Sequence, residues 1–280
     1  LGVEYAVKKA LELGRPAVVY VGLGSNCGSH DGYSLFEQYL CEVGKIPGIC
    51  VCVAGGNECL AKHHFFGCIA DGGEYQEVAV NVGEGGGDIY LSMWNNAPDV
   101  MSVSVTSPSG SVVEGVPTKA GTTFEKNLIM EKCNVMIAYN NPIYGCGCQN
   151  TIIRIVGAAA GLWMIRVKGE YISNGCFHIW LPITGFIPPE VNFVMPYKNF
   201  TLTIPGTCPN LIICCAYDAA TDEVYIRSSC GPNRMQRTLP SLVAPGADIV
   251  GIYPGGFGRM SGTGIATAIV AGSSAIPMQQ

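Results

Sequence analysis

The stretch S-G-T-G-I-A-T-A-I-V-A-G, at residues 261–272, decides how the last part of the chain is interpreted. Small and apolar residues follow Gly264 without a single charge, which is typical of a helix buried against other elements. Further upstream, L-I-I-C-C-A-Y at 211–217 and the turn residues at 218–222 predict a buried strand that leads into a hairpin. The end of the chain therefore combines strands with a buried helix.

The first part of the chain alternates helices and strands. Apolar residues spaced three and four apart predict a helix over residues 3–13, which Gly14 ends, and Ser34 caps a second helix over 34–43. Continuous apolar runs at 17–21 and 49–53 predict buried strands. Helix, strand, helix and strand in this order predict an α/β fold with a mostly parallel sheet flanked by helices.

Between these two parts the pattern changes to many short strands separated by turn residues. Segments such as Q-E-V-A-V-N-V, W-M-I-R-V-K-G and C-F-H-I-W-L-P predict an antiparallel β-sandwich, in which Val78, Val80 and Val82 share one face. We therefore expect residues 1–74 and 196–280 to form the two parts of one domain. Residues 75–195 form an all-β domain inserted between them.

Composition excludes several classes of function. The chain has 280 residues, a formal charge of −5 and a hydrophobic fraction of 48%, which is ample for a globular core. It has no basic run of the kind that binds nucleic acid or an anionic membrane. No apolar run reaches the roughly 20 residues of a membrane helix, and the first residues do not resemble a signal peptide.

The 14 cysteines are many for this length. Cys50 with Cys52, Cys146 with Cys148, and the adjacent pair at 214–215 lack the spacing and the histidine partners of a zinc site, so we expect no metal and no cofactor. Several of them lie in apolar runs, where cysteine behaves as a small hydrophobic residue. We expect mostly reduced structural thiols, and disulfides or metal binding are the alternatives.

Five segments, in order along the chain, carry a resemblance to one family. They are V-G-L-G-S at 21–25, V-A-G-G-N-E at 53–58, T-I-P-G-T-C-P-N-L-I-I-C-C-A-Y-D at 203–218, S-S-C-G-P at 228–232 and the opening stretch at 261–272. They resemble the S-L-G, A-G-N-E, late-strand, S-S-R-G-P and G-T-S-x-A-T-P segments of the subtilisin-like serine proteases, family S8. The resemblance implies a subtilisin-like sheet with the β domain inserted into it.

The resemblance also assigns the site residues. Gly264 stands at the position of the serine nucleophile, and Asn57 matches the asparagine that donates to the oxyanion. The substrate-binding positions are Leu23, Gly24, Ser25, Ala54, Gly55 and Gly56. The family's catalytic Asp and His precede the segment at which this sequence begins, so we expect no intact catalytic residue. The chain itself is expected to be a fragment that exposes strand edges and apolar helix faces.

A purely structural role remains an alternative interpretation for each of these residues. Asn57 also suits a loop that completes a turn after a strand, and Gly264 also suits close packing at the start of a helix. Ser261 and Thr263 flank Gly264, but the family geometry aims only the third residue of G-T-S into the cleft. His30, His63 and His64 are expected to be solvated or helix-capping groups, and His178 to belong to a strand of the inserted domain.

The inserted domain and segments such as G-R-P-A-V-V and G-S-H-D-G-Y-S-L-F-E-Q-Y-L resemble the Csp germination proteases of spore-forming bacteria. The glycine at position 264 makes the chain similar to the catalytically degenerate members of this branch, which are CspA and CspC in some species. The resemblance implies a pseudoprotease of the bacterial spore that binds an active Csp protease or its precursor, or a germinant such as a bile salt, an amino acid or calcium. The alternatives are an endopeptidase that processes a cortex-lytic enzyme precursor, with triad residues outside this segment, and a structural spore protein.

Overall fold

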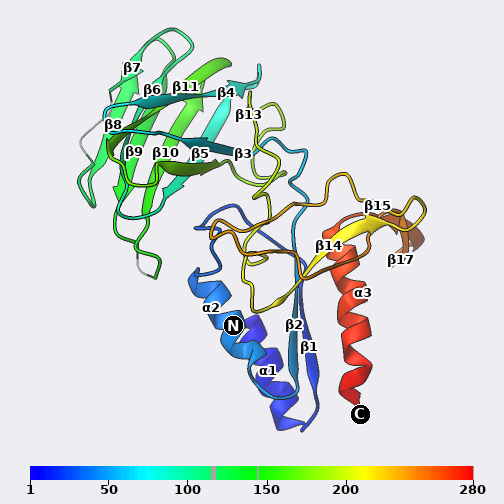
Figure 1. The fold of residues 1–280 in the computed structure, drawn as a ribbon. Coiled ribbons are helices and arrows are strands. Elements are labelled where there is room, and N and C mark those ends of the chain that lie inside the picture. Colours follow the sequence, from blue (N-terminus) through cyan, green and yellow to red (C-terminus); the bar gives the residue numbers. More distant parts are fainter. Residues whose placement is uncertain (115–117, 144, 280) are drawn as a thin grey trace. The chain divides into compact units, whose positions relative to one another are not determined.

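The computed structural model describes residues 1–114, 118–143 and 145–279. It contains two compact units, which are described separately (Figure 1). The first unit comprises Leu1–Leu60 with Asn199–Gln280, and the second comprises Ala61–Lys198. No helix among the described residues is long and apolar enough to cross a membrane.

The first unit is built on a mostly parallel sheet. Its helices and strands are α1 (Gly2–Glu12), β1 (Ala17–Val21), α2 (Leu35–Gly44), β2 (Ile49–Ala54), β14 (Ile212–Asp218), β15 (Glu223–Val224), β16 (Leu242–Pro245), β17 (Ile249–Tyr253), β18 (Gly256–Met260), α3 (Thr263–Ala275) and the 3₁₀ turn Pro277–Gln279. The strand order is β1-β2-β14-β15, with β16 also paired to β14. The β1–β2, β2–β14 and β14–β16 pairings are parallel, which confirms the predicted sheet.

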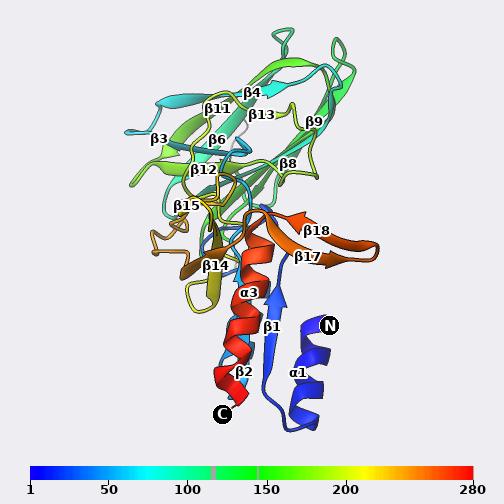
Figure 2. The same ribbon diagram turned by 90° about the vertical axis from the view of Figure 1, so that its right-hand side faces the viewer.

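Helices cover both faces of this sheet. Alternate residues of a strand point to opposite faces, so Val51 and Val53 of β2 pack with α1 and α2, whereas Cys52 packs with α3. Figure 1 shows α1 and α3 on opposite sides of β1 and β2, and Figure 2 shows β1 between the two helices. Burial on both faces explains why these strands are continuous apolar runs in the sequence.

Local signals set the two predicted helices of this unit. Ser34 precedes α2 and its hydroxyl accepts from the backbone N–H of Glu37, whose carboxylate accepts from the N–H of Ser34, so the two form a capping box. Gly14 follows α1 with a φ of 61°, the left-handed conformation that glycine adopts without strain. The predicted helices at 3–13 and 34–43 are therefore confirmed.

The cysteines of the sheet are mostly buried thiols, as expected. Burial raises the pKa of Cys52 to about 12, that of Cys214 to about 11 and that of Cys215 to about 12, so these thiols stay protonated at neutral pH. Ten of the 14 cysteines are free thiols, which agrees with the expectation, and the remaining four form the disulfides Cys41–Cys208 and Cys68–Cys176. Both pairs join segments more than 100 residues apart in the sequence, a proximity that local spacing does not reveal.

The second unit consists of two antiparallel sheets. Its strands are β3 (His64–Cys68), β4 (Tyr75–Val82), β5 (Gly87–Asn95), β6 (Val100–Thr106), β7 (Val112–Val113), β8 (Thr123–Leu128), β9 (Cys133–Asn140), β10 (Gln149–Ala158), β11 (Gly161–Tyr171), β12 (Cys176–Trp180) and β13 (Asn192–Phe193). One sheet has the order β3-β12-β5-β10-β9-β8 and the other β13-β4-β11-β6-β7. The expected boundary after residue 74 falls beyond β3, which the structure pairs with β12 in this unit.

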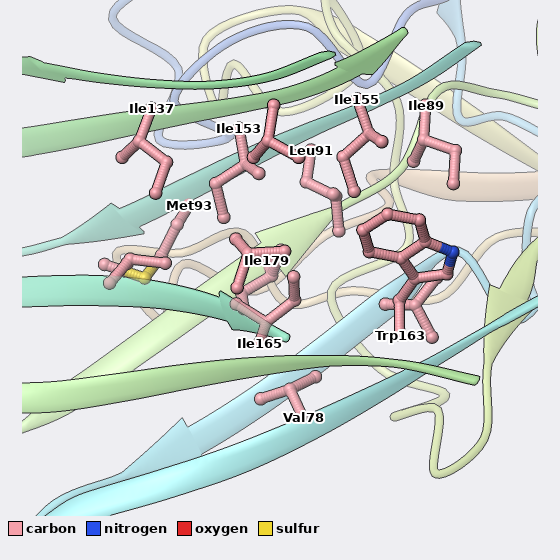
Figure 3. Close-up of a cluster of buried hydrophobic side chains, with 14 of the residues drawn as sticks. Val78, Ile89, Leu91, Met93, Ile137, Ile153, Ile155, Trp163, Ile165 and Ile179 are labelled. Atoms are coloured by element: carbon pink, nitrogen blue, oxygen red, sulfur yellow. The ribbon is translucent and has the colours of Figure 1, made fainter. Parts of the chain in front are cut away.

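Inward side chains of both sheets of the second unit form one buried cluster, shown in Figure 3. Val78, Val80 and Val82 are all at most 2% exposed, which confirms that they share one face of β4. Trp163 of β11 is fully buried in the same cluster, and its indole N–H donates to the carbonyl of Ala159 at 3.0 Å. This bond satisfies the polar atom of a large core side chain.

A buried polar network fixes the loop between β1 and α2. Asp31 accepts from the guanidinium Nη2 of Arg234 at 3.0 Å, and both side chains are at most 1% exposed. The Nε of Arg234 donates to the carbonyl of Ser29 at 2.6 Å. Both ring nitrogens of His30 lie within hydrogen-bonding distance of backbone carbonyls, those of Leu202 and Asn26. His30 is thus a buried part of the fold, which corrects the expectation of a solvated loop residue.

The stability of the first unit should depend on pH through His30. Burial lowers the pKa of His30 to about 4, against the carbonyl contacts and the nearby Asp31, which favour the protonated ring. The unfolded chain, with a pKa near 6.5, therefore binds more protons between these two values. His30 should therefore lower the unfolding free energy as the pH falls from about 6.5 to about 4, by up to about 1.4 kcal/mol per pH unit, and should contribute no further change below that.

Denaturant titrations of the full-length protein at several pH values measure this dependence. His30→Asn is the matched variant, because His30 has a φ of 49° and asparagine tolerates that left-handed conformation. The variant should be less stable throughout but should lack this contribution to the pH slope. Equal slopes in the two proteins would show that His30 does not titrate in the way its burial indicates.

Candidate functional site

The residues assigned by resemblance come together in the first unit, around the start of α3. Gly55, Gly56 and Asn57 follow directly after β2, and Gly264 is the second residue of α3. The backbone N–H of Gly56 donates to the hydroxyl of Thr263 at 3.1 Å. The loop after β2 is thereby bonded to the first turn of the helix.

Asn57 has a defined orientation. Its Oδ1 accepts from the backbone N–H of Thr263 at 2.9 Å. The atom that accepts from the backbone N–H must be the amide oxygen. The other amide atom, Nδ2, is therefore the donor of the side chain. The side chain is exposed, so its amide donor lies at the surface beside the start of α3.

Three further backbone hydrogen bonds hold the same loop in place. The N–H of Gly55 donates to the carbonyl of Cys214 in β14, and the carbonyl of Gly55 accepts from Thr203, both at 2.9 Å. The carbonyl of Gly56 accepts from the N–H of Ser229, also at 2.9 Å. These bonds make the loop a rigid element, which suits a preorganised binding surface.

The second assigned segment, at 23–25, follows β1. Leu23 is 69% exposed, whereas Ser25 exchanges two backbone hydrogen bonds of 2.9 Å with Ile204. A Cβ at Gly24 would lie 2.2 Å from the hydroxyl oxygen of Thr203, and a Cβ at Gly56 would lie 2.6 Å from the same oxygen. The buried side chain of Thr203 therefore stands against both assigned segments and explains why each has glycine there.

At the nucleophile position there is no side-chain oxygen. A Cβ at Gly264 would lie 3.3 Å from the phenol oxygen of Tyr20 and 3.5 Å from the carbonyl oxygen of Gly22. The Tyr20 hydroxyl donates to the carbonyl of Gly264 at 3.0 Å. Burial raises the pKa of Tyr20, so its phenol is a neutral donor at physiological pH.

The hydroxyls beside Gly264 already have structural roles. The Ser261 hydroxyl accepts from the backbone N–H of Asp248 at 2.8 Å. Thr263 is 1% exposed, and its hydroxyl accepts from Gly56 as described above. Thr263 is thus buried, whereas Ser261 is exposed and its hydroxyl oxygen is bonded to the loop at Asp248.

The remaining histidines belong to the second unit. His64 begins β3 and His178 lies in β12, as predicted for the latter, and their rings share a hydrogen bond of 3.0 Å between Nε2 and Nδ1. His63 and His64 are 5% and 1% exposed, which corrects the expectation that they are solvated. They are integrated into the fold of that unit.

Two residues at the site were not singled out from the sequence. Thr203 lies within a segment used only for the family resemblance, and Tyr20 lies within an apolar run. Thr263 was considered only as a neighbour of Gly264, and its hydrogen bond to Gly56 was not foreseen. The sequence did offer one indication for Tyr20, because it is a polar side chain near the end of a predicted buried strand. Its partner is 244 positions away, so the contact itself is visible only in the structure.

Among solved structures, the chain is similar to the CspB protease of Clostridium perfringens, with a TM-score of 0.89 and 27% sequence identity. The match covers 99% of this chain and 59% of that protease, so the chain spans less than two thirds of its structural relative. The prenylagaramide maturation protease PagA is 31% identical over 29% of each chain, but its TM-score of 0.25 carries no argument. No curated protein matches the chain.

Residues 77–280 match the subtilase family, peptidase S8, and this match covers more than half of the chain. It includes most of the second unit and the whole of the segment that ends in α3. The sheet with helices on both faces, the bonded loop at Asn57 and the helix that begins beside it agree with this family match. The chain belongs to the subtilase family.

Proposed function

We propose that this chain is part of a noncatalytic subtilase, a pseudoprotease, that acts by binding during germination of bacterial spores. The observation that carries the proposal is Gly264, which supplies no oxygen at the position of the serine nucleophile. Covalent catalysis by a subtilase requires that oxygen. Without it, the preorganised loop at Asn57 can still bind, but it accelerates no acyl transfer.

The structural roles of the neighbouring hydroxyls support this interpretation. For Ser261 or Thr263 to replace the nucleophile, each would have to give up a hydrogen bond to a backbone N–H, from Asp248 and Gly56 respectively. The bond at Thr263 is partly buried, and leaving a buried donor without its partner costs about 1–3 kcal/mol, whereas the exposed N–H of Asp248 can bond to water instead. Thr263 is therefore disfavoured as a substitute nucleophile.

The proposed partner is an active Csp-type protease or its precursor, because the similar structure is a Csp protease. A small germinant, such as a bile salt, an amino acid or calcium, is the second proposed ligand. We further propose that the two-sheet unit is the inserted jelly roll of the Csp branch and that its outer face contacts the protein partner. A protein of this kind shifts its partner's conformational equilibrium only by its differential affinity for the two states.

An endopeptidase that processes a cortex-lytic enzyme precursor is the alternative. It is favoured by the intact orientation of Asn57 and by the protease activity named for the similar structure. In that case the nucleophile and the other triad residues would come from outside this segment. The absence of an oxygen at Gly264 makes this alternative the weaker of the two.

Genetic complementation tests the proposed role. A strain that lacks the gene should germinate poorly, and the intact gene should restore germination. Gly264→Trp should fail to restore it if the cleft transmits the signal, since the indole would fill the space beside Tyr20 and Gly22. Asn57→Ala should weaken germination by removing the oriented amide.

Gly255→Trp is the matched control, because a side chain at Gly255 meets no atom within 4 Å and lies in the same unit. Immunoblots of spores check that each variant protein accumulates. Normal germination in the deletion strain would contradict the signalling role. Normal germination with Gly264→Trp, at normal protein levels, would show that the site around Gly264 is not the part that signals.

A further inference from the structure

The side chain of Tyr20 crosses from β1 to the first turn of α3. Its hydroxyl donates to the carbonyl of Gly264 at 3.0 Å, and the residue is 46% exposed. A Cβ at Gly22 would lie 2.0 Å from the phenol oxygen and 2.4 Å from the ring carbon that carries it. A side chain at residue 22 would therefore require the tyrosine side chain to move away from this position.

Backbone conformation does not explain why residues 22 and 264 are glycines. Neither Gly22 nor Gly264 has the positive φ that favours glycine. What both share is the space next to the Tyr20 hydroxyl, where a Cβ at Gly264 would lie 3.3 Å from the phenol oxygen. At Gly22 the steric conflict is severe, and at Gly264 the contact is tight.

These two glycines stand where the S-L-G and G-T-S segments of the family have serine. The glycines at both of these positions lie beside one side chain, that of Tyr20. A serine at 264 would carry its hydroxyl one bond beyond the Cβ, in a space bounded by the phenol and by the carbonyl of Gly22. The phenol is thus placed to hydrogen-bond such a hydroxyl and to limit access to it.

We propose that Tyr20 closes the former nucleophile position by placing its phenol against the first turn of α3. Tyr20 is a positioning residue, and its hydroxyl ties β1 to the helix through the carbonyl of Gly264. The inference deepens the proposed function, on which its meaning rests, because it concerns the same cleft. It implies that serine restored at 264 would be shielded as long as Tyr20 is present.

Chemical labelling of a thiol at position 264 tests the closure without requiring any catalytic activity. Gly264→Cys is placed in the full-length protein, reduced protein is treated with iodoacetamide, and peptide mass spectrometry follows the alkylation rate at residue 264. Cys27, an exposed free thiol of the same chain, is the internal standard. The thiol at 264 should react more slowly than Cys27.

Removing the phenol should expose the position. Tyr20→Ala combined with Gly264→Cys should raise the alkylation rate at 264 clearly above that with Tyr20 present, because it removes the ring and the hydroxyl that lie beside this position. Tyr20→Phe, which keeps the ring and loses only the hydroxyl, should give an intermediate rate and serves if the alanine variant is unstable. Tyr5→Ala is the matched control, because Tyr5 is an exposed tyrosine of α1, and it should leave the rate unchanged.

Equal alkylation rates in the Tyr20, Tyr20→Phe and Tyr20→Ala backgrounds would overturn the proposal. So would a thiol at 264 that reacts as fast as Cys27 while Tyr20 is present. Failure of the pseudoprotease proposal would instead be detected as peptidase activity, which is a separate measurement. The two failures are therefore distinguishable.

Discussion

The full-length protein should remain unlabelled by a fluorophosphonate probe at residues 261–264 and should hydrolyse no peptide above the buffer rate. The probe reacts with an activated serine oxygen, and Gly264 offers none. Loss of the nucleophile in a subtilisin-type site lowers kcat by roughly 10⁶-fold, whereas loss of an oxyanion donor alone costs about 10²- to 10³-fold. The missing oxygen therefore outweighs the intact orientation of Asn57.

An active Csp-type protease, labelled in parallel, is the positive control. Gly264→Ser alone should not restore turnover, because a serine needs a histidine and an aspartate as well, and because Tyr20 lies beside the restored hydroxyl. Mass spectrometry of the probe-treated protein locates any adduct. An adduct on Ser261 or Thr263 would contradict the prediction and would support the endopeptidase alternative.

The parts of the first unit that could be predicted are those encoded by neighbouring residues. The apolar run at Ala17–Val21 needs no partner to be recognised, and the same holds for the serine that caps α2. Parallel pairing then followed from the alternation of helices and strands, since such crossovers place strands side by side in one direction. The position of Gly264 at the start of α3 followed from its place before a small, apolar helix.

The contacts that were missed join residues far apart in the sequence. The Tyr20–Gly264 bond, the placement of Thr203 against Gly24 and Gly56, and the Cys41–Cys208 disulfide all depend on the folded arrangement of distant segments. Burial of His30 was missed for a related reason. A polar loop such as G-S-H-D-G is normally solvated, and it can be buried here because distant residues, among them Leu202 and Arg234, bond to its polar groups.

Arg234→Met should be among the most destabilising single substitutions in the chain. Arg234 and Asp31 are an ion pair whose side chains are at most 1% exposed, and the guanidinium also donates to the carbonyl of Ser29. Methionine fills a similar volume but leaves the Asp31 carboxylate buried without its counter-charge. Breaking a buried pair in this way costs about 3–5 kcal/mol, which is a large share of the stability of a typical domain.

Denaturant titrations of the full-length protein measure this loss, and a double-mutant cycle assigns it to the pair. Asp31→Asn combined with Arg234→Met should destabilise by clearly less than the two single substitutions summed, because the double variant leaves neither charge buried alone. Glu4→Gln is the control, since it breaks the exposed Glu4–Lys8 pair and should leave the denaturation midpoint almost unchanged. Additive effects of the two buried substitutions would show that the ion pair is not what holds the loop between β1 and α2 to the segment around Arg234.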